Sequence, residues 1–108
     1  RLSEDHGVIN RMGFNNDGME TIAHRLIKRD KAAGMVGVNM ASNSDSTDPA
    51  NDFDLLVEKF TPLADYMTID ISCPNTPNGK VFQSKAPLEG LLDEALGLGV
   101  DAGGGFVQ

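Results

Sequence analysis

Three polar residues, each at the end of a short apolar run, are the clearest indication of chemistry in this sequence. Asn10, Asn39 and Asp70 end or follow runs of valine and isoleucine, and they are 29 and 31 residues apart. Enzymes with parallel sheets carry reactive side chains just past the carboxyl ends of their strands, and a (β/α)8 barrel of roughly 250 residues repeats about every 31 residues. Each asparagine alone could simply cap a turn, but three polar positions in register predict a bound polar ligand.

Cys73 is the candidate for covalent or proton-transfer chemistry. It lies in the turn SCPN that follows the third apolar run. A lone cysteine is often a small buried apolar residue, but a thiol in a polar turn before a proline has little packing value. It is therefore a candidate nucleophile or general base. A thiol hydrolase is not expected, because His24 lies on the outside of a predicted helix and His6 precedes the first predicted strand at its far end.

The elements that would position these residues alternate between strand and helix. Asp17 with Glu20 is typical of a capped helix start, and Asp48-Pro49 opens a second helix with proline at its first position. This order predicts a parallel sheet. The predicted elements are a strand at 8–10, a helix from 17 to about 31–34, a strand at 35–40, a helix from 48 that Pro62 ends, a strand at 66–71, a loop at 72–86 and a helix from 87.

Alternation along the strands separates a polar face from an apolar face. The apolar face should lie under the helices, and Gly37 on the polar face should leave room for a group that approaches closely. The polar set is Asn10, Gly37, Asn39, Thr68, Asp70 and Ser72. The predicted helix faces that cover the sheet are Met19, Ile22, Ala23, Leu26 and Ile27, then Phe53, Leu56, Val57 and Phe60, then Leu88, Leu91, Leu92 and Ala95.

Length and composition place limits on these interpretations. A barrel needs at least about 200 residues, so the 108 residues here are expected to be a fragment of roughly three β/α units. A net charge of −7 argues against binding of nucleic acid or an anionic membrane surface through this segment. One cysteine cannot form an internal disulfide, and the sequence holds neither a membrane-spanning stretch nor a signal peptide.

Several stretches of the chain resemble the class 2 dihydroorotate dehydrogenases. They are RLSED (1–5), VINRMGFNNDG (8–18), VGVNM (36–40) with Asn43 and Ser46 beyond it, PLADY (62–66) and ISCPNT (71–76). These motifs occur in the family's order and at its separations over about residues 1–96. Residues 1–96 are therefore expected to be part of an FMN-binding domain, and the glycine-rich tail at 97–108 to be disordered or artefactual.

The resemblance implies a (β/α)8 TIM barrel that oxidises dihydroorotate to orotate in pyrimidine biosynthesis, with FMN as cofactor and a quinone as electron acceptor. It implies that Cys73 is the catalytic base, that Asn39 contacts FMN, and that Asn10 and Asp70 contact both FMN and the pyrimidine. The pyrimidine would be bound by Asn10, Arg11, Met12, Gly13, Phe14, Asp70 and Asn75. The parent protein would associate with the cytoplasmic side of the membrane through an N-terminal segment absent here, whereas these residues look soluble and are expected to be inactive alone.

Two residues depart from the class 2 pattern. Cys73 stands where class 2 usually has serine and class 1 has cysteine, and Asp70 stands where the family has asparagine. An ionised Asp70 would repel an anionic substrate and oppose thiolate formation at Cys73. The sequence leaves open whether Asp70 is protonated, points away or impairs activity. It also leaves open a class 1-like enzyme that uses fumarate or NAD, and a non-catalytic truncated fragment.

Overall fold

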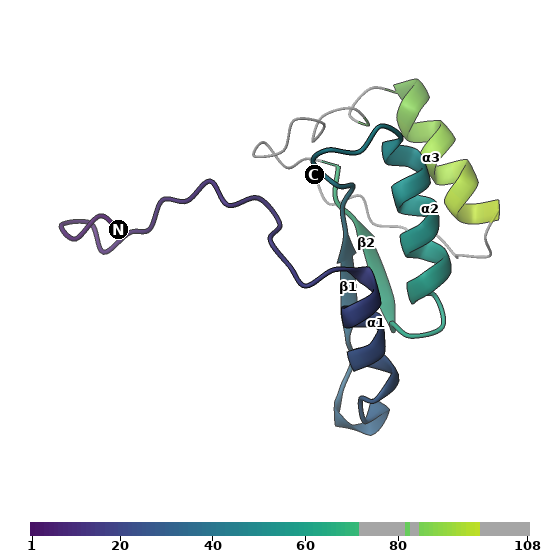
Figure 1. The fold of residues 1–108 in the computed structure, drawn as a ribbon, viewed down its shortest axis with the longest axis horizontal. Helices are drawn as coiled ribbons and strands as arrows, with labels where there is room; N and C mark the ends of the chain where they lie inside the picture. Colours follow the sequence, from purple (N-terminus) through teal and green to yellow (C-terminus); the bar gives the residue numbers. More distant parts are fainter. Residues whose placement is uncertain (72–81, 83–84, 98–108) are drawn as a thin grey trace.

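The computed structural model describes residues 1–71, 82 and 85–97 (Figure 1). Over these residues, helices and strands follow the alternating order of an α/β protein. The elements are α1 (Met19–Ile27), a 3-10 turn η1 (Lys31–Ala33), β1 (Gly37–Met40), α2 (Pro49–Phe60), β2 (Tyr66–Ile69) and α3 (Lys85–Gly97).

The strands β1 and β2 form a parallel sheet, in which Gly37 pairs with Tyr66 and Asn39 pairs with Thr68. The backbone N–H of Asp70 donates to the carbonyl of Met40 at 2.8 Å, so pairing continues just beyond the end of β2. The predicted parallel α/β fold is confirmed. The strands themselves are shorter than predicted, since β1 begins at Gly37 rather than residue 35 and β2 ends at Ile69 rather than residue 71.

The core lies between the apolar face of the sheet and helices α2 and α3, which lie side by side in Figure 1. The rings of Phe53 and Phe82 meet edge to face with centroids 5.5 Å apart. The buried members are Met40, Phe53, Val57, Phe82 and Leu91, and the strand residues packed against them include Val38, Met67 and Ile69. The prediction that the apolar strand face lies under the helices is therefore confirmed.

Helix α2 starts where the sequence predicts, but α1 does not. The carboxylate of Asp48 accepts a hydrogen bond from the backbone N–H of Asn51 at 3.3 Å, and Pro49 is the first residue of α2. In α1, the capping position is held by Gly18, with φ 90° and ψ 157°, and no side chain caps the helix. Asp17 lies one residue before this position. The predicted capping by Asp17 is wrong, and its carboxylate instead pairs with Arg25 at 2.6 Å.

The N-terminal arm, residues 1–17, differs most from the prediction. Residues 8–10 were expected to form a strand, but they make no ladder hydrogen bond with any described residue, and Val8 and Ile9 are 70% and 74% exposed. Leu2 and Gly7 close a short antiparallel turn, and Figure 1 shows the arm reaching away from the sheet. A strand of this kind is held by pairing and burial, and neither is supplied to residues 8–10 by the described part of the chain.

Two helix predictions also need correction. Ile27 was expected on the buried face of α1, yet it is 66% exposed, because the helix ends there and the chain turns into η1. Helix α3 begins at Lys85 rather than Pro87. Proline is tolerated at this position because backbone N–H groups of a first turn have no partner within the helix. Among the described residues, no helix is both long and apolar enough to cross a membrane.

Candidate functional site

Asn39 and Asp70 lie next to each other at the carboxyl ends of the two strands. The Nδ2 group of Asn39 donates a hydrogen bond to Oδ2 of Asp70, at 3.4 Å. Because β1 and β2 are parallel and Asn39 pairs with Thr68, residues separated by 31 positions meet at one edge of the sheet. The structure thus brings together two of the three polar positions that the sequence placed in register.

The same sheet face carries Gly37, and the group that approaches it closely is the ring of Tyr66. A Cβ atom at position 37 would overlap this ring and would lie 2.6 Å from its hydroxyl oxygen. Tyr66 is paired with Gly37 across the strands and is itself 58% exposed. The space that Gly37 leaves is therefore occupied by the ring of Tyr66. This contact lies at the start of the strands, away from the carboxyl ends where Asn39 and Asp70 meet.

A groove of about 710 Å³ passes the carboxyl end of β1. The arm contributes Met12, Gly13 and Phe14, and the strand contributes Asn39. The loop after β1 contributes residues 41–44. The groove also extends along the apolar face, where Val38 and Met40 and side chains of α1 and α2 line it. This volume lies within the range of about 300–1,000 Å³ for small-molecule sites. Part of the predicted pyrimidine-binding segment thus faces the same space as Asn39.

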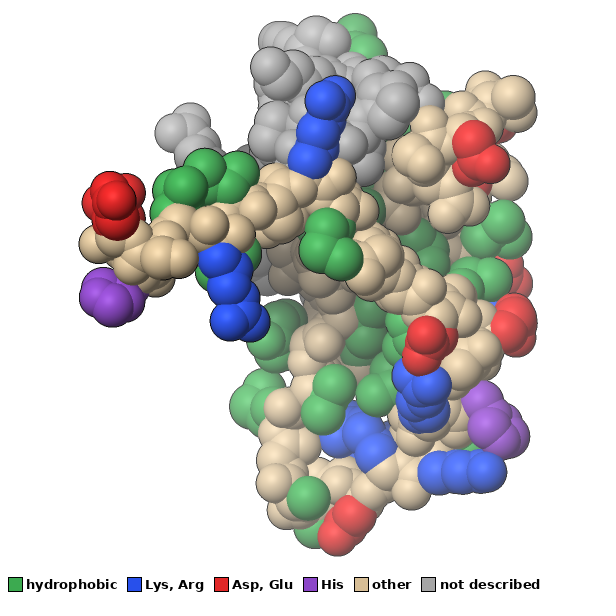
Figure 2. Space-filling model, turned by 60° about the vertical axis from the view of Figure 1, so that its left-hand side comes forward, with side chains coloured by type: hydrophobic (Ala, Val, Ile, Leu, Met, Phe, Trp, Pro, Cys, Tyr) green, Lys and Arg blue, Asp and Glu red, His purple; other side chains and the backbone are tan. Residues whose placement is uncertain are grey.

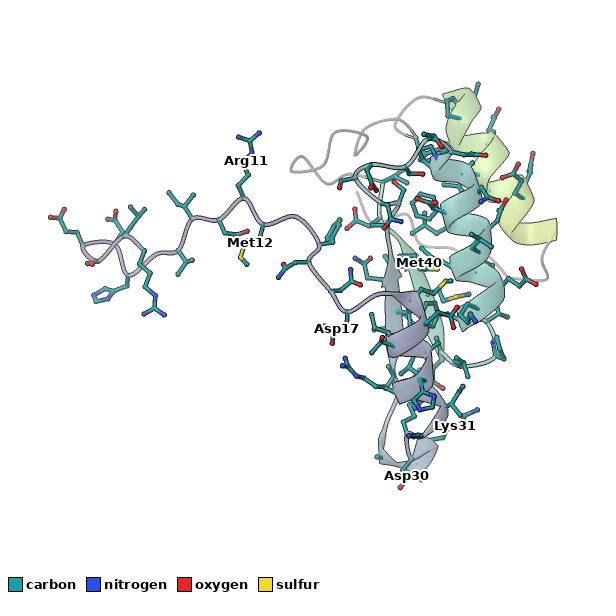
Figure 3. The ribbon with its side chains drawn as sticks, viewed as in Figure 1. Arg11, Met12, Asp17, Asp30, Lys31 and Met40 are labelled. Carbon is teal, nitrogen blue, oxygen red and sulfur yellow. The ribbon has the colours of Figure 1, made fainter. Side chains whose placement is uncertain are left out.

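Other predicted site residues are not brought into this arrangement. Oδ1 of Asn10 accepts a hydrogen bond from the backbone N–H of Met12 at 3.3 Å, which is a local turn in the arm. Asn10 and Arg11 do not line the groove, and Figure 3 shows Arg11 projecting from the arm. Hydrophobic side chains also lie on the surface along the arm in Figure 2. Cys73 and Asn75 lie outside the described residues.

The loop between β1 and α2 contains an anchor that the sequence analysis missed. The backbone N–H of Asn43 donates to Oδ2 of Asp52 at 2.9 Å, and Asp52 also lines the groove. Further along the loop, the N–H of Ser46 donates to the carbonyl of Asn43 at 3.2 Å. Acidic residues are common in the first turn of a helix, so Asp52 alone does not predict this contact. The only signal in the sequence is that Asn43 and Asp52 lie close enough in the chain to meet.

A second cluster that sequence reasoning missed lies at the opposite, amino-terminal end of the strands. Arg29, whose side chain is 12% exposed, pairs with Asp65 at 2.8 Å. Asp65 also accepts from the backbone N–H of Val36 at 2.8 Å. The Val36 N–H, together with the adjacent Arg29, holds the pKa of the Asp65 carboxyl below its ordinary value of 3.8, although partial desolvation opposes this shift. We call these three residues the Arg29 clamp.

The described site residues are compatible with a flavin but show no metal centre. The amide of Asn39 uses one N–H toward Asp70 and retains a second N–H and a carbonyl oxygen for the polar edge of a planar ring. An ionised Asp70 can only accept hydrogen bonds, so it suits a ring N–H and not a carboxylate. Among the described residues, no group of three or more histidine, cysteine, aspartate or glutamate side chains could hold a metal ion.

Comparison with known proteins gives one consistent family. The family model described as dihydroorotate dehydrogenase matches residues 1–97. A dihydroorotate dehydrogenase (quinone) of Rhodopseudomonas palustris strain HaA2 is 49% identical over 92 residues, covering 85% of this chain and 25% of that protein. A protein of the same description from Bradyrhizobium sp. strain ORS 278 is 48% identical over 96 residues, covering 89% of this chain and 26% of the relative. The chain thus spans about a quarter of the length of these curated relatives.

A solved structure shows the same similarity in three dimensions. The chain resembles the dihydroorotate dehydrogenase of Eimeria tenella, crystallised in complex with ferulenol, with a TM-score of 0.77 and 30% sequence identity. The match covers 91% of this chain and 28% of the Eimeria chain. The backbone arrangement of the described elements is therefore that of a segment of this enzyme.

Proposed function

Since this chain belongs to the dihydroorotate dehydrogenase family, we propose that its full-length protein oxidises dihydroorotate to orotate, with FMN as cofactor and a quinone as electron acceptor. In this proposal, residues 1–96 are part of the FMN-binding barrel and residues 97–108 lie outside it. The observation that carries the proposal is the meeting of Asn39 and Asp70 at the carboxyl end of the sheet, where Asn39 and the arm line the same groove. Quinone use is supported by the relatives described as quinone-dependent.

Each site residue has a role that suits its chemistry. Asn39 holds the flavin through its amide, and Asp70 lies between cofactor and substrate. Asn10, Arg11 and Asn75 bind the polar groups of the pyrimidine, while residues 12–14 line its pocket. Uncharged amides can hold a ring amide and a carboxylate without competing for the proton that leaves.

Cys73 is the proposed base. Its thiolate removes the proton from C5 of dihydroorotate, and the electron pair of that C–H bond forms the new C5–C6 double bond as hydride leaves C6. When bound, FMN supplies the acceptor for this hydride. Proton removal by a positioned side chain contributes about 10²–10⁴-fold to the rate. The parent protein would meet its quinone at the cytoplasmic side of the membrane.

The test is the electron-acceptor profile of the full-length protein. Dihydroorotate oxidation should proceed with a soluble quinone analogue and should be much slower with fumarate or NAD. Cys73 is the one residue that favours a class 1-like alternative, so faster turnover with fumarate or NAD would replace the quinone assignment. Absence of dihydroorotate oxidation with all three acceptors, in protein that carries FMN, would contradict the proposed reaction itself.

A further inference from the structure

The loop between β1 and α2 forms one wall of the groove, and the carboxylate of Asp52 on α2 holds it at Asn43. Residues 41–44 of this loop line the groove directly after Asn39. The backbone N–H of Asn43 donates to Oδ2 of Asp52 at 2.9 Å, which is a hydrogen bond to a carboxylate. Asn43 is thereby tied directly to helix α2.

The Asp52 carboxylate is held in place because helix α2 is fixed by its packing in the core and by the cap at its start. One residue after Asp52, Phe53 is buried in the core, and Val57 follows it on the same face. At the start of the helix, Asp48 accepts from the backbone N–H of Asn51 at 3.3 Å. The position of the Asp52 carboxylate is thus set by the core, and Asn43 is held relative to the core through it.

The rest of the loop depends on Asn43. Its carbonyl accepts from the N–H of Ser46 at 3.2 Å, and the N–H of Asp48 donates to Oγ of Ser46 at 3.3 Å. Asn43 is therefore held through both its N–H and its carbonyl. Asn43 is the member of this series of hydrogen bonds that lies nearest to Asn39 in the sequence. Loss of the bond to Asp52 would free Asn43 from helix α2.

We propose that Asp52 is a positioning residue for the cofactor site. Its carboxylate holds the loop at residues 41–44 in place beside Asn39. The proposal rests on the proposed function, since it takes the groove beside Asn39 to be where FMN binds. Asp52 does not touch the reacting atoms in this account. It acts through the backbone of Asn43, and any acceptor oxygen at the same place can substitute in part.

The experiment compares Asp52→Ala, Asp52→Asn and a matched control, Asp54→Ala, in the full-length protein. Asp54 lies on the same helix and takes no part in the loop contacts described above. In Asp52→Ala, hydrogen exchange at the Asn43 amide should accelerate roughly tenfold to a hundredfold, as expected for loss of a hydrogen bond to a charged group. The dissociation constant for FMN, measured by quenching of flavin fluorescence, should rise about tenfold or more.

The other variants separate positioning from general stability. Asp52→Asn keeps an acceptor oxygen and should fall between wild type and Asp52→Ala in both measurements, whereas Asp54→Ala should leave both unchanged. The proposal is overturned if Asn43 exchange does not change in Asp52→Ala, if amides of β1 and α2 accelerate equally, or if FMN affinity is unchanged while Asn43 exchanges faster. If wild-type protein binds no FMN, the cofactor proposal fails independently, and the exchange of Asn43 still decides whether Asp52 holds the loop.

Discussion

Removal of the guanidinium from the Arg29 clamp should destabilise the protein without touching the proposed site. Arg29 donates to the carbonyls of Gly34 at 3.2 Å and Leu63 at 3.4 Å, in addition to its ion pair with Asp65. Arg29→Met retains most of the aliphatic stem, so the change removes these bonds with little loss of packing. The two loops that precede β1 and β2 would then lose their shared donor.

The size of the effect follows from these contacts. Hydrogen bonds that involve a charged group contribute about 1.5–3 kcal/mol when short. The two carbonyl bonds are long, at 3.2 and 3.4 Å, so they belong at or below the low end of that range. Their loss should lower the free energy of unfolding by about 2 kcal/mol in total. The bond to Leu63 is partly buried, so water replaces it less readily than the exposed bond to Gly34.

The acid dependence of stability should change as well. The pKa of Asp65 is lowered in the folded state, so the stabilisation it provides is present above its ordinary pKa of 3.8 and is lost as pH falls through the lowered value. Arg29→Met should reduce this loss, because one cause of the lowered pKa is gone. The bond from the Val36 N–H remains, so part of the acid dependence should persist.

The assay is urea unfolding of the full-length protein, followed by circular dichroism, at pH 7 and at pH values around and below 4. Arg25→Met is the control, since Arg25 lies on α1, four residues before Arg29, but the side chains of its ion pair with Asp17 are 63% and 60% exposed. An exposed pair contributes about 0–1 kcal/mol. The clamp would be refuted as a stabilising feature if Arg29→Met were no more destabilising than Arg25→Met at pH 7.

Three further predictions concern the site and the sheet. In the full-length protein, Cys73→Ala should lower dihydroorotate oxidation by about 10²–10⁴-fold with unchanged FMN content, whereas Cys73→Ser should retain activity; equal rates for Cys73→Ala and wild type would exclude the base. Asp70→Asn should strengthen binding of the anionic substrate if the carboxylate is ionised and faces it, measured as a lower KM, and a clear loss of activity would show that the carboxylate has a positive role. Gly37→Ala should destabilise modestly because the new Cβ displaces the Tyr66 ring, and this loss should disappear in a Tyr66→Ala background.

The parts of the fold that the sequence could predict are those set by local pattern. The helical spacing of Phe53, Val57 and Phe60 identifies a buried face, and all three side chains are buried. Strand alternation likewise separated Asn39 from Val38. Asn39 is exposed, while Val38 packs against the core. In each case the periodicity of one element is sufficient, because the core covers whichever face is apolar.

The Arg29 clamp could not be predicted, because it depends on contacts between distant parts of the chain and not on a local pattern. Arg29 and Asp65 are 36 residues apart, and their contact depends on how the loops before β1 and β2 turn at the ends of the sheet. Many arginine and aspartate residues at helix ends and before strands would look alike in sequence. The contact exists only once the parallel pairing of the strands has placed Val36 next to Asp65.

The same reasoning explains why two of the three polar positions meet and the third does not. Asn39 and Asp70 come together because β1 and β2 pair directly, so a separation of 31 residues becomes adjacency at the strand ends. Asn10 shares the spacing, yet spacing brings residues together only through a hydrogen-bonded ladder, and residues 8–10 have none with the described part of the chain. The match to the related Eimeria enzyme covers 28% of that chain. A role for Asn10 at the cofactor therefore requires the arm to pair beside β1, and that pairing would also bury Val8 or Ile9, whose exposure is otherwise unfavourable.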